Sequence, residues 1–184
     1  MGAFVLGLPT NASARIRPAT RDDLLALAAI RRRSWQATYR GVVPDAVLDG
    51  MSDRRSAHTM VRGTRSPLEA VLLAEGPDGT PLGYAWVGPH REGLPGHGGE
   101  IYELYLEPAA QGQGIGRQLL VAAIWALVER GLQPVVVWVL AANPARRFYE
   151  ACGGEPLVRD TVKIGGRTLR RIALSWRGGL PLPR

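Results

Sequence analysis

A glycine-rich turn set between a strand and a helix, past the middle of the chain, constrains the fold more than any other feature. Residues 100–106 are β-prone and end before Pro108, and residues 111–116 read Gln-Gly-Gln-Gly-Ile-Gly. From residue 116 to 130 apolar side chains recur at the spacing of one helical face, and Gly131 supplies a stop. Residues 134–140 are then almost continuously apolar and mostly β-branched, as in a strand covered on both faces. This strand–turn–helix–strand unit predicts a mixed α/β sheet covered by helices.

Further strands and helices are predicted on both sides of this unit. A Pro77-Asp78-Gly79 turn between the β-rich segments 69–75 and 81–87 indicates a hairpin of antiparallel strands. Thr20, followed by Asp22 and Asp23, favours a helix start. Residues 35–43 and 90–99 are expected to contain connecting loops. The other expected elements are a strand at 15–18, helices at 21–34, from 44 and at 53–62, a short helix at 143–152, and strands at 158–164 and 168–176 that meet at Gly165-Gly166.

Length and composition favour one domain. A chain of 184 residues, 46% of them hydrophobic, is long enough for one full core and short for two. We expect a single domain at 14–177 with flexible ends at 1–13 and 178–184. No apolar stretch reaches the roughly 18 residues of a membrane span, and residues 1–8 lack the features of a secretory signal. The sequence therefore predicts a cytoplasmic protein with no membrane partner.

The charge and the metal-binding residue types exclude little by themselves. The formal net charge is +7, Lys163 is the only lysine, and the arginines are dispersed instead of alternating with aromatic residues. This pattern favours a solvated basic surface over a nucleic-acid site, and we expect no nucleic-acid partner. Cys152 is the single cysteine, and His58, His90 and His97 are scattered, so no metal site is predicted.

The glycine-rich turn has the features of a phosphate cradle. Backbone N–H groups at the start of a helix lack partners, and the helix dipole favours negative charge there. Glycine at Gly112, Gly114 and Gly116 avoids Cβ atoms that would clash with a ligand or forbid the dihedral angles of the turn. A plain tight turn is the alternative. The dinucleotide fingerprint follows an early strand, and the P-loop needs a lysine that this segment lacks.

Two segments resemble the signatures of the GNAT acetyltransferase family. Residues 107–116, Glu-Pro-Ala-Ala-Gln-Gly-Gln-Gly-Ile-Gly, resemble its Gln/Arg-x-x-Gly-x-Gly/Ala motif, with Gln111, Gly114 and Gly116 at the fixed positions. Residues 143–154, Asn-Pro-Ala-Arg-Arg-Phe-Tyr-Glu-Ala-Cys-Gly-Gly, resemble its Asn…Ala…Phe-Tyr-Glu…Gly helix. Two departures stand out. One residue fewer than usual separates Asn143 from the Phe-Tyr pair, and Gly154 replaces a frequent phenylalanine, which we expect to widen the pocket there.

The resemblance implies the acyl-CoA N-acyltransferase fold, a three-layer α-β-α arrangement whose mixed central sheet is mostly antiparallel. It also implies acetyl-CoA as co-substrate, with the pyrophosphate on the glycine-rich turn, the pantetheine arm along the preceding strand, and the thioester near Asn143 and Tyr149. Residues 34–41 resemble the acceptor-side region of bacterial members, which assigns Trp35 and Tyr39 to the acceptor. The residues implied in cofactor binding are Tyr105, Leu106, Gln111, Gly112, Gln113, Gly114, Ile115, Gly116, Arg117 and Asn143.

Acetyl transfer to an amine needs an uncharged acceptor, a donor to the carbonyl oxygen and a proton for the departing thiolate. Tyr149 is the candidate acid, because a phenol stays protonated at neutral pH. Glu100 and Glu103 are the candidate bases, with Glu100 preferred, although either fits a solvent-side strand position equally well. The Leu106 N–H is expected to polarise the thioester if its strand separates from its neighbour near Pro108. Cys152 fits a small buried hydrophobic residue better than a nucleophile.

We therefore predict an acetyl-CoA-dependent N-acetyltransferase that transfers directly to a primary amine in a ternary complex. A small-molecule amine is preferred as acceptor and a protein N-terminus or lysine comes second, because Glu100, Glu103 and Glu107 are expected to attract a cationic amine. A longer acyl donor or a hydroxyl acceptor stays open, since variable loops build acceptor pockets. A non-catalytic CoA-binding protein and a basic nucleic-acid-binding domain are the alternatives from other classes. A homodimer is compatible with the resemblance.

Overall fold

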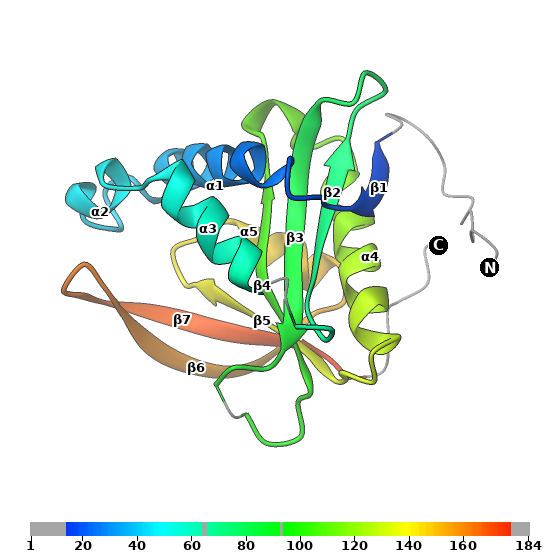
Figure 1. Ribbon diagram of the computed structural model, residues 1–184. Coiled ribbons are helices and arrows are strands. Elements are labelled where there is room, and N and C mark those ends of the chain that lie inside the picture. Colours follow the sequence, from blue (N-terminus) through cyan, green and yellow to red (C-terminus); the bar gives the residue numbers. More distant parts are fainter. Residues whose placement is uncertain (1–13, 64–65, 93, 178–184) are drawn as a thin grey trace.

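The computed structural model describes residues 14–63, 66–92 and 94–177, and shows one mixed sheet (Figure 1). Within these residues the strand order is β1-β2-β3-β4-β5-β7-β6, and every neighbouring pair is antiparallel except β4 and β5. The predicted mixed, mostly antiparallel sheet is confirmed. The strands are β1 (Arg15–Pro18), β2 (Ala70–Glu75), β3 (Pro81–Pro89), β4 (Gly99–Leu106), β5 (Val135–Leu140), β6 (Glu155–Ile164) and β7 (Arg167–Trp176).

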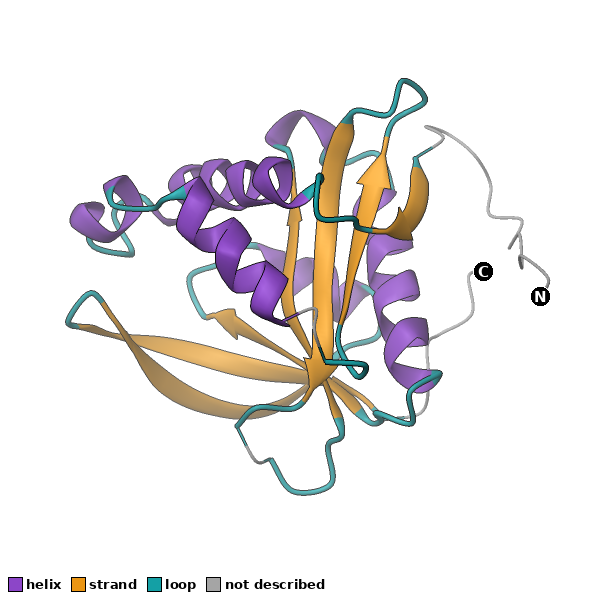
Figure 2. Ribbon diagram, viewed as in Figure 1, coloured by secondary structure: helices purple, strands orange, loops and turns teal. Residues whose placement is uncertain are grey.

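Helices cover both faces of the sheet and complete the three layers (Figure 2). On one face, buried side chains of α1 (Leu24–Tyr39) and α3 (Asp53–Gly63), such as Leu27 and Met60, pack against Leu73 and Tyr84 of the sheet. On the other face, α4 (Ile115–Val128) buries its apolar stripe, and α5 (Ala145–Ala151) packs beside it. The short α2 (Asp45–Asp49) and the 3-10 turn η1 (Pro108–Ala110) complete the helices of the described residues.

Helix α1 is longer than the sequence predicts. The expected end near Ser34 is wrong, because the helix continues to Tyr39 and places Trp35 and Tyr39 on its last turn instead of in a loop. No glycine or proline interrupts residues 24–39, and the chain turns only at Gly41, whose φ is +81°. The extension brings the C-terminal end of α1 over the sheet.

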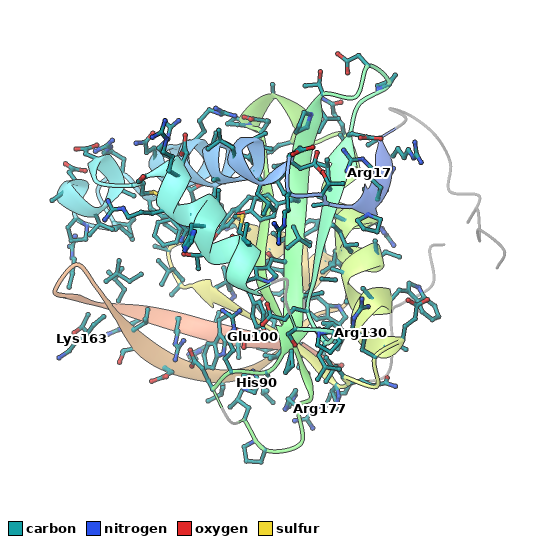
Figure 3. The ribbon with its side chains drawn as sticks, in the orientation of Figure 1. Arg17, His90, Glu100, Arg130, Lys163 and Arg177 are labelled. Carbon is teal, nitrogen blue, oxygen red and sulfur yellow. The ribbon has the colours of Figure 1, made fainter. Side chains whose placement is uncertain are left out.

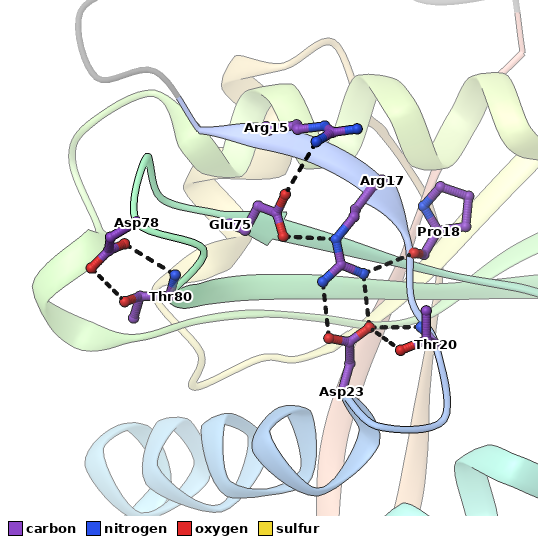
Figure 4. Close-up of polar contacts among 8 residues, drawn as sticks. All are labelled: Arg15, Arg17, Pro18, Thr20, Asp23, Glu75, Asp78 and Thr80. Carbon is purple, nitrogen blue, oxygen red and sulfur yellow. Dashed lines mark hydrogen bonds and ion pairs between the residues drawn. The ribbon is translucent and has the colours of Figure 1, made fainter.

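An ion-pair network fixes the other end of α1 (Figure 4). Arg17 of β1 donates from Nη1 and Nη2 to the Asp23 carboxylate at 2.8 and 2.9 Å, and from Nε to Glu75 of β2 at 2.7 Å. Asp23, the residue before α1, also accepts from the backbone N–H of Thr20 at 2.6 Å, and the helix begins at Leu24 instead of the expected residue 21. The Arg17 guanidinium holds the pKa of the Asp23 carboxyl well below its usual range. The network joins two strands to the start of the helix.

Helix α2 meets the tip of the β6–β7 hairpin. Gly165 lies at that tip with φ +57°, and a Cβ there would lie 2.4 Å from Cγ2 of Val47. Tyr39, Leu48 and Leu140 form a small buried cluster under this contact. The long hairpin is thereby held against the C-terminal end of α1.

No helix of the described residues is long and apolar enough to cross a membrane. The predicted flexible ends, 1–13 and 178–184, lie outside the described residues, so the proposed domain limits stay a prediction.

Candidate active site

The glycine-rich turn presents free backbone donors at the start of α4. Gly112 and Gly114 have φ of +75° and +81°, and nothing lies within 4 Å of the positions that their Cβ atoms would occupy. Among the described residues, no hydrogen-bond partner is found for the backbone N–H groups from Gly112 to Gly116, whereas the N–H of Arg117 bonds to Gly114 O at 3.1 Å. Glycine therefore shapes a cradle of donors open to solvent, as an anion site requires.

Gly116 serves the turn in a different way. Its backbone is helical, and a Cβ would lie 3.3 Å from Leu106 Cδ1 and 3.5 Å from two ring carbons of Phe148. The residue therefore allows the first turn of α4 to approach the end of β4 and the ring of α5. Dihedral freedom is therefore required at Gly112 and Gly114, whereas Gly116 is required for close packing.

The side chains of the turn point to different places. Arg117 and Gln111 are exposed and line the cavity described below. Ile115 is buried in the core, and the Gln113 amide donates to Ala109 O at 2.8 Å, so neither side chain lines that cavity. Only the backbone of Gln113 and Ile115 is available to a ligand.

Strands β4 and β5 separate beside this turn. They pair only from Gly99 to Ile101 of β4, because a bulge at Tyr102 shifts the register of β4 against β3. The separation thus begins at the bulge, earlier than the expected point near Pro108. Glu107 N donates to Leu82 O of β3 at 2.9 Å. Because strand N–H groups alternate, the Leu106 N–H points the other way, into the gap beside β5.

A cavity of about 600 Å³ runs through this gap from one face of the sheet to the other. Its turn end is formed by Gln111, Gly112, Gly114 and Arg117, and its aromatic end by Ser34, Thr38, Tyr39, Glu103, Tyr105 and Trp138. Asn143, Phe148, Tyr149 and Cys152 also line it. The structure thus brings together residues from most of the segments that the sequence singles out.

Tyr149 and Asn143 of this cavity differ in their bonding. Asn143 Oδ1 accepts from Ala145 N at 2.9 Å, and its Nδ2 donates to the Tyr39 hydroxyl at 2.5 Å, so the side chain caps α5 and joins it to α1. Tyr149 is 5% exposed, and no hydrogen-bond partner of its hydroxyl is found among the described residues. Burial raises the pKa of the Tyr149 phenol above its usual range. The cavity therefore contains a protonated, unpaired phenol.

Comparison with known proteins identifies the family of the chain. Residues 29–154, more than half of the chain, match the family described as the acetyltransferase (GNAT) family. The chain belongs to this family. The predicted family and the acyltransferase class of enzyme are thereby confirmed.

Relatives cover the GNAT chain to different extents. It is 30% identical over 161 residues to the uncharacterized N-acetyltransferase YuaI of Bacillus subtilis, covering 88% of this chain and 91% of the relative. A mycothiol acetyltransferase of Arthrobacter is 42% identical over 88 residues, and the match covers only 26% of that longer protein. The likeness to YuaI therefore extends over most of the fold, whereas the match to the Arthrobacter protein covers 45% of this chain.

Solved structures of the family superpose well. The ribosomal-protein-alanine N-acetyltransferase of Brucella melitensis matches with a TM-score of 0.69 at 28% identity, over 89% of this chain and 99% of its own. The yncA protein of Salmonella typhimurium, solved with its cofactor acetyl-CoA, matches with a TM-score of 0.66 at 26% identity, over 90% and 94%. The acyl-CoA N-acyltransferase fold is confirmed, and members with this fold bind acetyl-CoA.

The glutamates expected as bases of this GNAT chain lie in different places. Glu103 lines the cavity, whereas Glu100 does not. Figure 3 shows Glu100 beside His90 at the far end of the sheet from the turn, and their Oε2 and Nδ1 atoms are 3.0 Å apart. Glu100 is buried and also accepts from the backbone N–H of Arg91 at 3.0 Å. The geometry favours Glu103 as the glutamate of the site.

Trp35 and the described part of loop 90–99, which were expected to help form the acceptor pocket, lie outside the lining of the cavity. Trp35 does not line the cavity but donates from Nε1 to the Tyr105 hydroxyl at 2.7 Å, so it supports a lining residue. Loop 90–99 contributes no lining residue among its described part, although its Glu92 pairs with Arg171 of β7. Neither the resemblance that assigned Trp35 nor the loop position of residues 90–99 gives the direction of a side chain.

Trp176 is a residue of the site region that sequence reasoning missed. A Cβ on Gly154 would lie 2.9 Å from Trp176 Cζ2, so the indole fills the space that the expected phenylalanine would take. Its Nε1 donates to Cys152 O at 2.9 Å, and its ring meets Tyr149 edge-on at 6.1 Å. The expectation of a wider pocket at Gly154 is therefore wrong, because a side chain from β7 closes it.

Proposed function

We propose that this GNAT chain is an acetyl-CoA-dependent N-acetyltransferase that transfers an acetyl group directly to a primary amine, with a small-molecule amine as acceptor. The observation that carries the proposal is one cavity that joins a cradle of free backbone donors to an unpaired buried phenol. The first suits a pyrophosphate, and the second suits a leaving thiolate. A ligand that carries both a pyrophosphate and a thioester needs both groups in one cavity.

The turn end would hold the nucleotide part of the co-substrate. The N–H groups from Gly112 to Gly116 would donate to the pyrophosphate, and Arg117, for which no ion pair is found among the described residues, would add a positive charge. Gln111 lines the same end. The open edge of β4 at Tyr105 and Leu106 would pair with the amide groups of the pantetheine arm, as an added strand pairs with a free edge.

Tyr149 is the proposed acid. Its hydroxyl has no competing partner, and burial keeps the phenol protonated well above neutral pH. It would give its proton to the sulfur that leaves, while the Leu106 N–H donates to the carbonyl oxygen of the thioester. Burial also raises the pKa of the Cys152 thiol, which argues against a covalent role for this residue.

Acceptor identity is the finer part of the proposal. Tyr39 lies at the aromatic end of the cavity. Trp35 meets the Tyr39 ring edge-on at 5.1 Å and also donates a hydrogen bond to the Tyr105 hydroxyl. A peptide N-terminus or a lysine is the second candidate, because a neighbour at 28% identity is named a ribosomal-protein-alanine N-acetyltransferase. The proposed location is the cytoplasm, and a homodimer stays a prediction from the resemblance.

The test is a calorimetric titration with acetyl-CoA followed by an amine screen read by mass spectrometry of the products. Binding in the micromolar range with transfer to at least one amine supports the proposal. Binding without transfer to any amine or peptide would leave a non-catalytic CoA-binding protein, and no binding by folded protein would refute the co-substrate itself. A nucleic-acid domain would instead show affinity for DNA or RNA that falls steeply between about 50 and 200 mM salt.

A further inference from the structure

Every carboxylate near the point of transfer is already engaged. Glu103 is the only acidic residue that lines the described cavity, and no histidine lines it. Its Oε1 accepts from Arg31 Nε at 2.9 Å, and its Oε2 accepts from the Tyr84 hydroxyl. Both oxygens therefore have strong donors, one of them a buried phenol and the other a guanidinium.

The neighbouring glutamates are engaged in the same way. Glu100 is bonded to His90 and to the backbone of Arg91, and Glu107 accepts from Arg33 Nε at 3.1 Å. The segments outside the described residues contain no aspartate or glutamate, so they add no carboxylate side chain. The expectation that Glu100, Glu103 and Glu107 give the site a free negative charge is therefore wrong, because each has a partner.

The phenols of the aromatic end are partly occupied as well. The Tyr39 hydroxyl accepts from Asn143 Nδ2, and the Tyr105 hydroxyl accepts from Trp35 Nε1. Arg31 lies over the Trp35 ring, with Cζ at 5.0 Å from its centroid, and keeps its positive charge next to Glu103. An ammonium group placed here would meet a guanidinium and no free carboxylate, which disfavours the charged form of an amine.

We propose that the acceptor is an amine of low basicity, an α-amino group, which enters the cavity uncharged. This inference rests on the proposed function and narrows its substrate class. Roughly one tenth of an α-amino group with a pKa of about 8 is uncharged at about pH 7, against roughly one part in 2,500 of a lysine side chain with a pKa of about 10.4. In a site that cannot deprotonate its acceptor, the uncharged fraction therefore favours the α-amino group by roughly 200-fold.

The transfer balances without an enzymatic base. The uncharged nitrogen forms the new bond to the acetyl carbon, the carbon–sulfur bond breaks, and the nitrogen then releases one proton to solvent. Tyr149 gives its proton to the departing thiolate and regains one from solvent. No oxidant, metal or further co-reactant is required.

The test compares acceptors that differ only in the position of the amine. The full chain with saturating acetyl-CoA is assayed with alaninamide, with a lysine-free peptide that has a free N-terminus, and with the same peptide blocked at the N-terminus and carrying one lysine. We expect kcat/KM for the lysine peptide to be lower by roughly 100-fold or more at about pH 7, and to rise about tenfold per pH unit up to about pH 10. For the α-amino acceptors it should level off above about pH 8. Alaninamide against the free peptide shows whether the α-amino group belongs to a small molecule or a chain.

Arg31→Gln sharpens the test because it frees Oε1 of Glu103. We expect the preference for α-amino over lysine acceptors to shrink by about tenfold, since an unpaired carboxylate can hold or deprotonate an ammonium group. Arg32→Gln is the matched control, because Arg32 pairs with Asp53 at 2.8 Å and does not line the cavity, so its preference should stay that of the parent. Equal values of kcat/KM for both amines in the parent at about pH 7 would overturn this inference but leave the proposed function standing. Absence of transfer to every acceptor would refute the proposed function and the inference with it.

Discussion

The turn end and the aromatic end of the cavity are built by opposite means. The turn end presents backbone N–H groups of a single contiguous segment, Gly112 to Gly116, whose positions depend on glycine dihedral angles. The aromatic end presents side chains of α1, β4 and β5, among them Tyr39, Glu103 and Trp138, which meet only after the sheet has formed. One end depends on local backbone shape and the other on tertiary packing.

The difference explains which kinds of substitution each end tolerates. Free backbone donors survive most side-chain changes but fail when a Cβ or a charge enters the turn. Side chains held by partners, such as Glu103 between Arg31 and Tyr84, change their chemistry when one partner is removed. Variants of the two ends should therefore separate binding of acetyl-CoA from transfer to the acceptor.

The largest effect is expected for Gly114→Glu at the turn end. The variant puts a side chain and a negative charge into the cradle, and we expect affinity for acetyl-CoA to fall by roughly 100-fold or more in a calorimetric titration. Gly79→Glu is the control, since Gly79 also has a positive φ, +80°, with open space around it, and lies in the β2–β3 turn. Both variants carry a backbone strain of about 1–2 kcal/mol, so only the cradle effect differs. Equal loss of affinity in both would mean that strain, not phosphate binding, is being measured.

Tyr149→Phe should leave binding intact and remove the proton donor. We expect kcat to fall by roughly 100-fold, the lower end of what a general acid contributes, with the dissociation constant of acetyl-CoA unchanged. Because burial raises the pKa of the phenol, the parent should keep its rate as pH rises to about 9 instead of losing it through deprotonation of the acid. Steady-state kinetics across that range provide the check. An unchanged kcat in the variant would remove Tyr149 from the mechanism.

What the sequence predicts follows the same division. The order of strands and helices, the hairpin at Gly79 and the glycine-rich turn depend on local signals, namely apolar periodicity and glycine at positive φ, and the structure has them. Glu100 and Glu103 could not be separated from the sequence, because the Tyr102 bulge that sets the faces of β4 depends on pairing with β3. The position of a residue in a strand predicts which face its side chain takes, but the sequence does not show where a bulge interrupts that alternation.

Gly154 and Trp176 show the limit most clearly. They are far apart in the chain, and the pattern around Gly154 alone predicts an empty space, whereas β7 brings an indole into that space. The partners Arg31, Tyr84 and Arg33 of the glutamates come likewise from other elements. Such pairings depend on how strands and helices are aligned in the fold, and the spacing of residues in a single sequence does not reveal that alignment.

A moderate effect is expected for Trp176→Phe, which tests how Tyr149 is held. The phenol has no hydrogen bond found among the described residues, so its position depends on ring packing against Phe148 and Trp176 and on the bond from Trp176 to Cys152 O. We expect kcat to fall by about tenfold, with acetyl-CoA affinity unchanged, because the phenol loses part of the packing that orients it and a misplaced acid transfers its proton more slowly. Trp125→Phe, on the exposed face of α4, is the control.

The decisive readout for Trp176 is a double-mutant cycle with Tyr149→Phe. If Trp176 acts through the phenol, Trp176→Phe should lower kcat much less in the Tyr149→Phe background than in the parent. Equal losses in both backgrounds would assign Trp176 a purely structural role. Thermal unfolding of each variant separates a change of stability from a change of geometry.

The smallest effect is expected for Asp23→Asn, at the end of α1 farthest from the cavity. Loss of the ion pair with Arg17 should loosen the helix that carries Tyr39, raising the acceptor KM by about twofold while acetyl-CoA affinity stays unchanged, because a partly exposed pair contributes little. The pKa of Asp23 is depressed in the folded chain, so its stabilisation is fully present above the unfolded pKa of about 3.9 and is lost progressively as pH falls from there through the lower folded pKa. The difference between the melting temperatures of parent and variant should therefore be constant between about pH 7 and about pH 5, begin to shrink below about pH 4, and vanish only where the folded carboxyl is itself protonated. A difference in melting temperature that persists after the carboxyl is protonated would mean that shape rather than charge connects Asp23 to α1. A matching loss of acetyl-CoA affinity would show that the two ends of the cavity are not independent.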